Sequence, residues 1–186
     1  MKENKGITLI ALIVTIIVLL ILAAVSIATL MGKNGVITNA QKTSTENAYY
    51  GAEEQVKLAY MAVRTEIMSQ VVADGTYDAR LATNVEKLAQ IVKEDLSDAS
   101  SWEIKYTGDT VDSTTGKNKE EKDGLIYIKY IDTKIDRATI NNTAGKEKPA
   151  NEGCVYYTIT IKDQNATLEP DLAGVPTATV GTFQDV

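Results

Sequence analysis

The residues that usually carry enzyme chemistry are scarce in this chain. Among its 186 residues there is no histidine, and there is one cysteine, Cys154. This composition excludes Ser-His-Asp and Cys-His catalysis, histidine-containing zinc sites and an intrachain disulfide. The sequence also lacks a glycine-rich phosphate loop and a recognisable pair of nucleophile and base. We therefore expect a protein that is not an enzyme and carries no cofactor.

Oxygen-bearing side chains occupy every second position between residues 163 and 171. Ca²⁺ prefers oxygen ligands, so four of these residues are candidate calcium ligands: Asp163, Asn165, Glu169 and Asp171. The run has no glycine at its sixth place, and Pro170 interrupts it. We expect a plain acidic loop here, with calcium binding as the alternative.

The clearest feature of the sequence is an uncharged apolar segment over residues 7–31. Four hydroxyl residues are its only polar positions: Thr8, Thr15, Ser26 and Thr29. A helix of 25 residues is about 38 Å long, against about 30 Å of bilayer hydrocarbon, so it can span a membrane with some tilt. Lys2 and Lys5 precede the segment and orient the N-terminus to the cytoplasm. We expect a single-pass precursor in the cytoplasmic membrane, with the rest of the chain outside.

Three interpretations of this segment compete. A secretory signal peptide would be cut near Ser26-Ile27-Ala28, although its apolar region is normally only about 7–15 residues long. A plain signal anchor requires only length and apolarity. The third interpretation uses the residues before the segment. A short polar leader, MKENKG, ends in Gly6 and is followed at once by ITLIALIVTIIVLLILA.

This arrangement resembles the leader of type IV prepilins and pseudopilins. The resemblance implies a leader peptide over residues 1–6, cut after Gly6 by prepilin peptidase, and methylation of the new N-terminus at Ile7. A glycine suits the cut, because a residue without a Cβ readily enters a protease cleft in extended form. The resemblance further implies that residues 7–32 form a transmembrane and filament-core helix, and that residues 33–186 form an extracellular head.

The partners that this resemblance implies are prepilin peptidase, identical or related pilin subunits, and the pilus assembly machinery. The expected product is a structural subunit of a type IV pilus-like filament on the cell surface. Within the same family, the alternative is a pseudopilin of a type II secretion or DNA-uptake machine. The alternative from another class is a membrane-anchored extracellular binding protein that does not polymerise.

One position departs from the family pattern. The family usually carries Glu at the fifth mature position, where this chain has Ala11. In the family that Glu pairs with the N-terminal amine of a neighbouring subunit, and an unpaired charge in an apolar core is costly. The amine of Ile7 must therefore be met by other groups. The candidates are the Thr8 hydroxyl with nearby carbonyls, or a Glu on a different type of subunit.

Periodic patterns predict helices before and within the head. Gly32 and Gly35 interrupt the first helical run and predict a hinge, with a simple helix end at the membrane surface as the alternative. Apolar residues at spacings of three and four then predict a helix over 36–72 and a connecting helix over 83–97. The first of these is amphipathic, with Tyr, Ala, Val and Ile on one side.

The pattern then changes to a period of two, which predicts antiparallel strands over about 102–183. The expected strands are at 102–106, 125–131 and 154–161, with a weaker one at 177–183 and an additional one at 133–140. Cys154 opens the third strand as a small buried residue, with a disulfide between chains as the alternative. The expected fold class is α+β, with a long N-terminal helix packed on a small antiparallel sheet, as in a pilin.

The chain carries a net negative charge and one long hydrophilic stretch. There are 19 Lys and Arg against 25 Asp and Glu, a formal net charge of −6, so nucleic-acid binding is not indicated. Residues 108–124 are hydrophilic apart from Val111. We expect an exposed connection between two strands there, with a binding loop on a filament surface as the alternative.

Overall fold

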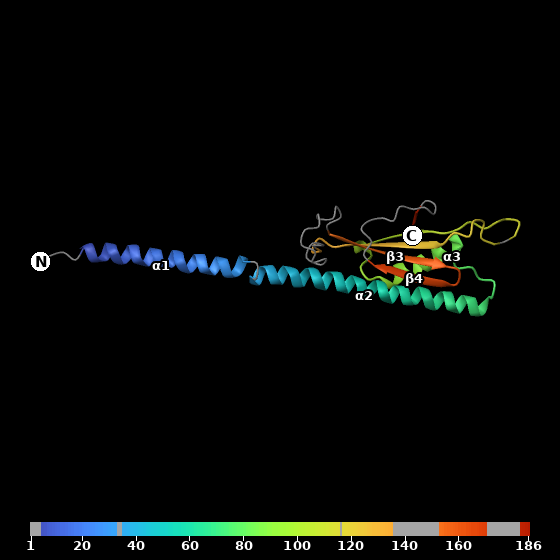
Figure 1. Cartoon of the computed structure of the whole chain (residues 1–186), viewed down its shortest axis with the longest axis horizontal. Coiled ribbons are helices and arrows are strands. Elements are labelled where there is room, and N and C mark those ends of the chain that lie inside the picture. Colours follow the sequence, from blue (N-terminus) through green and yellow to red (C-terminus); the bar gives the residue numbers. More distant parts are fainter. Residues whose placement is uncertain (1–4, 33–34, 116, 136–152, 171–182) are drawn as a thin grey trace. The chain divides into compact units, whose positions relative to one another are not determined.

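The computed structural model describes residues 5–32, 35–115, 117–135, 153–170 and 183–186 (Figure 1). The chain divides into two compact units, Met1–Ser44 and Thr45–Val186. The sequence places the start of the head at residue 33, whereas the second compact unit starts at Thr45. The difference arises because the side chains of residues 36–44, in the first turns of the second helix, are exposed.

The first unit is dominated by helix α1 (Lys5–Met31), which is continuous over 27 residues. Helix α2 (Val36–Ala73) begins after a short break and runs for 38 residues, where the sequence predicts a helix over 36–72. Figure 1 shows both helices as long and unbroken along their own lengths.

Within the second unit, one face of α2 is buried. Ala52, Val56, Ala59, Val63 and Ile67 are each at most 2% exposed, and their spacing of three and four residues brings them to one side of the helix. Near the start of this unit, the buried Thr45 donates a hydrogen bond from Oγ1 to the carbonyl of Lys134 at 2.6 Å. Thr45 therefore anchors the side of α2 to the turn that follows β2.

Helix α3 (Ala82–Asp95) lies where the sequence predicts a helix over 83–97. It ends earlier than predicted because Leu96 adopts an extended conformation, with φ −82° and ψ 119°. Its inward residues Val85, Leu88 and Val92 are fully buried. A short 3₁₀ turn, η1 (Ala99–Ser101), then leads into the sheet.

Five antiparallel strands form one sheet in the order β4-β3-β2-β1-β5. They are β1 (Trp102–Thr107), β2 (Gly124–Ile131), β3 (Cys154–Lys162), β4 (Asn165–Pro170) and β5 (Gln184–Asp185). The register places Ile104 opposite Ile128, and Ile128 opposite Tyr157. Because side chains alternate along a strand, these three residues face the same side. They join the buried residues of α2 and α3 in one core, which confirms the predicted α+β fold.

The opposite face of the sheet carries an aromatic pair that the sequence does not reveal. The rings of Tyr127 and Tyr156 stack at a centroid distance of 5.9 Å, and Phe183 lies 6.0 Å from Tyr127. Both tyrosines are almost fully buried, at 1% and 4% exposed. Burial raises the pKa of Tyr127. These residues meet because strand register aligns positions that are distant in the sequence.

Two predicted strands have no counterpart among the described residues. Residues 133–135 form a turn, and the rest of the predicted strand at 133–140 lies outside the described residues. The predicted strand at 177–183 also lies outside them except for Phe183, which directly precedes β5. Cys154 is half-buried at the start of β3, opposite Ile131.

Candidate assembly surfaces and a polar head cavity

Helix α1 presents an apolar surface that its own unit does not cover. Sixteen large apolar side chains between Leu9 and Met31 are 46–72% exposed. A soluble monomer rarely exposes so large a contiguous apolar surface. By length and composition, the helical run that begins at Leu9 is suited to cross a membrane, and it is the one such candidate among the described residues. Any function of this chain must account for what covers this apolar surface.

The hydroxyl groups of α1 that the structure describes, those of Thr15, Ser26 and Thr29, bond within the helix. Thr15 donates to the carbonyl of Leu12 at 2.8 Å, Ser26 donates to Leu22 at 2.7 Å, and Thr29 donates to Ser26 at 2.9 Å. Because these side chains bond to their own backbone, they present no unpaired polar group to lipid or to another helix. The described surface of α1 therefore offers no free hydrogen-bonding group to its surroundings.

The positions that the leader resemblance singles out lie at the start of α1. Gly6, Ile7 and Thr8 belong to its first turns, and their side chains lie outside the described part of the structure. Ala11 is an exposed residue of the same helix. The arrangement brings no carboxylate from a described residue of α1 near these positions, because α1 contains none.

The predicted glycine hinge coincides with the break between the two helices. The Gly32 amide still donates to the Ala28 carbonyl at 2.9 Å, and the Gly35 amide donates to the Gly32 carbonyl at 2.7 Å. A Cβ at Gly32 would lie 2.6 Å from the Ala28 oxygen, and a Cβ at Gly35 would overlap the Leu30 oxygen. Both positions therefore need glycine because the backbone approaches closely, a reason that the sequence does not reveal.

A second exposed apolar surface lies on α2, and the sequence analysis missed it. Leu58, Met61, Met68 and Val72 are 60–88% exposed, and Tyr50 is 60% exposed. We call these five residues the α2 outer stripe. At 100° per residue, they lie on the side of α2 directly opposite the residues that face the sheet. Their spacing, with Thr65 between Met61 and Met68, matches the three-four repeat by which helices pack on helices.

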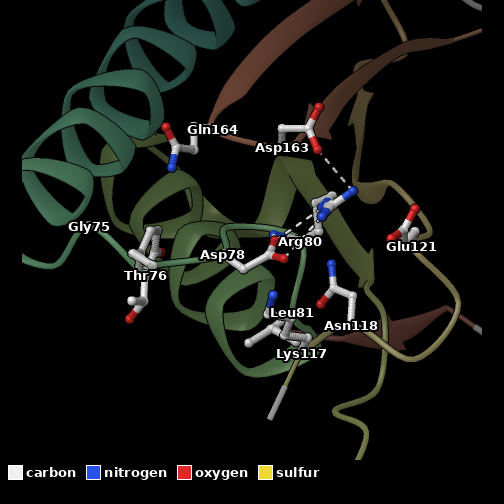
Figure 2. A pocket seen from close by; sticks show the side chains of 11 residues that line it. Gly75, Thr76, Asp78, Arg80, Leu81, Lys117, Asn118, Glu121, Asp163 and Gln164 are labelled. Carbon is white, nitrogen blue, oxygen red and sulfur yellow. Dashed lines mark hydrogen bonds and ion pairs between the residues drawn. The ribbon is translucent and has the colours of Figure 1, made fainter. Parts of the chain in front are cut away.

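The head also contains a polar cavity of about 580 Å³ (Figure 2). Three separate segments line it: residues 75–81 between α2 and α3, residues 117–121 in the long connection, and the β3–β4 turn at 163–164. Figure 2 shows their side chains arranged around Arg80.

Arg80 lies at the centre of this cavity (Figure 2). Its Nε and Nη2 donate to the two carboxylate oxygens of Asp78, each at 3.1 Å, and its Nη1 lies 3.0 Å from Oδ1 of Asp163. Burial tends to raise the pKa of Asp78, but the hydrogen bonds and charge of Arg80 outweigh it and lower that pKa. Asp78 is therefore a carboxylate in a fixed orientation at neutral pH.

The long connection between β1 and β2 is anchored by a buried carboxylate. Asp109 is 4% exposed and accepts backbone N–H groups from Thr110 at 2.7 Å, Glu120 at 2.9 Å and Lys122 at 3.2 Å. Burial tends to raise the pKa of Asp109, and these donors overcome that effect and lower it. The predicted exposed connection is therefore ordered over part of its length, because the Asp109 carboxylate accepts hydrogen bonds from amides near both of its ends.

The alternating oxygen residues at 163–171 do not form a calcium site in the described structure. Residues 165–170 are strand β4, so Asn165, Thr167 and Glu169 are exposed along one face while Ala166 packs inward. Asp163 instead pairs with Arg80, and Asp171 lies outside the described residues. No group of three acidic, histidine or cysteine residues in the described part could hold a metal ion. The period of two was the signature of a strand rather than of ligand spacing.

Comparison with known proteins gives no family for this chain. No family model, curated protein or solved structure matches it.

Proposed function

We propose that this chain is a structural subunit of a type IV pilus-like filament. The observation that carries the proposal is α1, which has no charge after Lys5, exposes its large apolar side chains and satisfies its described hydroxyls internally. Before assembly, lipid of the cytoplasmic membrane would cover this surface, with the N-terminus inside. After assembly, α1 helices of neighbouring subunits would cover it on the outside of the cell.

The leader supports this proposal over a plain anchor. MKENKG is short and polar, and the apolar run begins directly after Gly6. In the proposed sequence of events, prepilin peptidase cuts between Gly6 and Ile7 and methylates the new amine. The pilus assembly machinery then extracts the processed subunit into the filament. An ordinary anchor requires neither the short leader nor the glycine.

The composition of α1 also suits helix-to-helix packing. Ala24 and Ala28 lie on one side of α1, and Gly32, directly after its end, continues their interval of four residues. Small residues at this spacing allow helix backbones to approach closely, and close van der Waals packing drives helix association where no water is present. A helix that only had to dissolve in lipid would not need such a surface.

The α2 outer stripe gives the proposal a second line of support. It is apolar, 60–88% exposed, and has the helix-packing repeat. A solitary head would leave these side chains in water, whereas a neighbouring subunit in a filament would cover them. The runner-up, a pseudopilin of a secretion or DNA-uptake machine, uses the same surfaces in a shorter assembly. A membrane-anchored binding protein that does not polymerise would have α1 covered by lipid but would leave the α2 outer stripe in water.

Shearing of intact cells tests the proposal. We expect the chain in sheared filaments visible by electron microscopy, with the precursor in the membrane fraction. Gly6→Val should block processing and keep all of the protein in the membrane, because a branched Cβ hinders the extended conformation required for cleavage. Glu3→Gln changes the same leader while leaving the cut site intact, and should assemble normally. Wild-type protein confined to membranes would contradict the filament function.

A further inference from the structure

The polar cavity of the head has the construction of a ligand-binding site. Its volume of about 580 Å³ falls within the range of roughly 300–1,000 Å³ that is usual for small-molecule sites. Residues from three segments far apart in the sequence converge on it. The filament function proposed above makes no use of this cavity, so it calls for a separate explanation.

The polar groups of the cavity are held in place before any ligand arrives. The Asp78 carboxylate accepts two hydrogen bonds from the guanidinium of Arg80 and a third from the backbone amide of Arg80 at 3.0 Å. Asn84 donates to the Asp78 carbonyl at 2.7 Å, which fixes the same segment from α3. Fixed donors and acceptors reduce the entropy that a ligand must lose on binding.

Asn118 gives a second, independent indication of a ligand. It lines the cavity, and its amide nitrogen and oxygen are both buried without a hydrogen-bond partner. The amide lies close enough to Asp78 to contribute to the lowered pKa of that carboxylate, yet it makes no hydrogen bond of normal geometry. A buried amide without partners is destabilising, and such groups are rare in folded proteins.

The backbone at Glu121 is also unusual. Its φ is 53°, in the left-handed region that a long side chain seldom adopts. Asp163 shares this conformation, but there it follows from the two-residue turn between β3 and β4. At Glu121 it fits the anchored connection, in which the flanking amides of Glu120 and Lys122 both donate to Oδ2 of Asp109, and the Glu121 side chain lines the cavity.

The charged side chains that line the cavity restrict which class of ligand fits it. Three carboxylates, from Asp78, Glu121 and Asp163, face only two cations, Arg80 and Lys117, which disfavours an anion. Arg80 occupies the centre, which disfavours a metal ion. Because two of the three carboxylates already pair with Arg80, little charge is left to attract an organic cation, and a neutral ligand with many hydrogen-bonding groups fits the lining best.

We propose that this cavity binds a neutral sugar, of one or two rings. Each sugar hydroxyl can both donate and accept hydrogen bonds, so neighbouring hydroxyls suit side chains that offer paired groups, as Asn118, Gln164 and Asp78 do. The half-buried Tyr77 adds an aromatic ring to the lining, and such a ring can pack against the apolar face of a sugar. The inference does not depend on filament formation, because the site lies within one head.

A glycan array probed with the full-length chain tests this inference. The chain is kept in a zwitterionic detergent, because detergents with sugar head groups would compete for the site. The array carries neutral hexoses and N-acetylhexosamines, alone and as short oligosaccharides, beside acidic glycans. The best neutral sugar is then titrated calorimetrically. We expect saturable one-to-one binding of a neutral sugar; binding to acidic glycans alone, or to none, would overturn the proposal.

Paired variants locate the site. Glu121→Gln and Gln164→Ala alter exposed lining residues and should each weaken sugar binding about tenfold. The first replaces a charged hydrogen-bond acceptor with a weaker neutral amide, and the second removes an amide altogether. Glu120→Gln makes the same charge change one residue away, outside the lining, and should leave affinity unchanged. Melting curves of all three should match the wild type. Equal affinity in the Glu121, Gln164 and Glu120 variants would show that the sugar binds elsewhere and would refute the assignment.

Discussion

Helices α1 and α2 are both long and both carry many apolar residues, but only α2 buries any of them within the described structure. In α2, one side packs into the core of the second unit, from Ala52 to Ile67. In α1, the large apolar side chains on every side are 46% exposed or more, and no charge interrupts the segment. Polar residues separate the apolar ones in α2 and thereby define a single inward face. Nothing defines such a face in α1.

The difference in exposure indicates what covers the apolar residues of each helix. A helix with one apolar stripe can complete a core of its own chain. A helix that is apolar all round must be covered by something else, either lipid or other helices. The α2 outer stripe lies between these cases, because it adds an uncovered apolar strip to a helix that is already packed on the other side. We therefore expect mutations in the two helices to affect different properties.

The largest effect on stability should come from the inward face of α2. Ile67→Ala removes a side chain that is 1% exposed and should destabilise the head by about 2–5 kcal/mol, because it leaves a cavity in the core. The adjacent Met68→Ala, in the outer stripe at 62% exposed, should change stability by no more than about 0.5 kcal/mol. Denaturant unfolding of the full-length chain measures both. Equal destabilisation would remove the distinction between the two faces.

A charge in α1 should act on insertion and assembly but not on the head. Leu19→Lys places an ammonium near the middle of the apolar segment and should cost about 2.5–3.5 kcal/mol on membrane insertion. We expect weaker membrane insertion and no sheared filament, with an unchanged melting transition of the head. Ser69→Lys adds the same charge to an exposed position of α2 and serves as the control. Assembly of the Leu19 variant at normal yield would contradict the role given to α1.

The anchored connection should loosen in acid. The lowered pKa of Asp109 means that the carboxylate binds protons less readily in the folded state than in the unfolded state. Its contribution, on the order of 1–3 kcal/mol, is therefore present above the ordinary carboxyl pKa of about 3.9 and is lost as the pH falls through the lower folded value. Hydrogen exchange of the Glu120 and Lys122 amides should accelerate over that range. In Asp109→Asn, this step should be absent; exchange that shows the same acid step in both proteins would exclude Asp109 as its source.

The glycine break gives a smaller and more local effect. Gly35→Ala brings a Cβ to 2.9 Å from the Gly32 oxygen and into overlap with the Leu30 oxygen, so the backbone there must shift. We expect altered filament yield or flexibility, with insertion and head stability unchanged. Gly51→Ala provides the control, since a Cβ there meets nothing within 4 Å. Filaments of the two variants that look identical under electron microscopy would show that the close contact at Gly35 is dispensable.

The smallest effect is expected at Ala11. If the chain assembles alone, Ala11→Glu adds a partner for the Ile7 amine of a neighbour and should be tolerated or raise filament yield. If the chain assembles beside a Glu-bearing subunit, the second carboxylate should repel the first and change the composition of the filament. Mass spectrometry of sheared filaments distinguishes these outcomes. Unmixed filaments at equal yield from both forms would show that Ala11 marks no special position.

Much of the architecture follows from periodicity in the sequence. The helix predicted over 36–72 and the strands at 102–106, 125–131 and 154–161 correspond to α2, β1, β2 and β3, because each buries one regularly spaced set of residues. Strand β4 escaped prediction because only Ala166 and Leu168 alternate on its inner side, while its outer side suggested metal ligands. A short strand with so few apolar residues gives a weak signal until a neighbour pairs with it.

The cavity and the anchored connection could not be predicted for a different reason. Asp109 looks like any loop carboxylate in the sequence, and its role depends on amides 11 and 13 positions away. Arg80 and Asp163 meet only because the β3–β4 turn lies beside the segment that precedes α3. The α2 outer stripe, in contrast, was visible in the spacing of Leu58, Met61, Met68 and Val72.

The N-terminal mass of the chain recovered from sheared cells decides whether a processed subunit enters a filament. We expect protein in the filament fraction that begins at Ile7 and carries a methylated amine, so that residues 7–31 of α1 enter the filament without the polar leader. An intact Met1 in that fraction, a start near Thr29, or the complete absence of the chain from sheared material would contradict it.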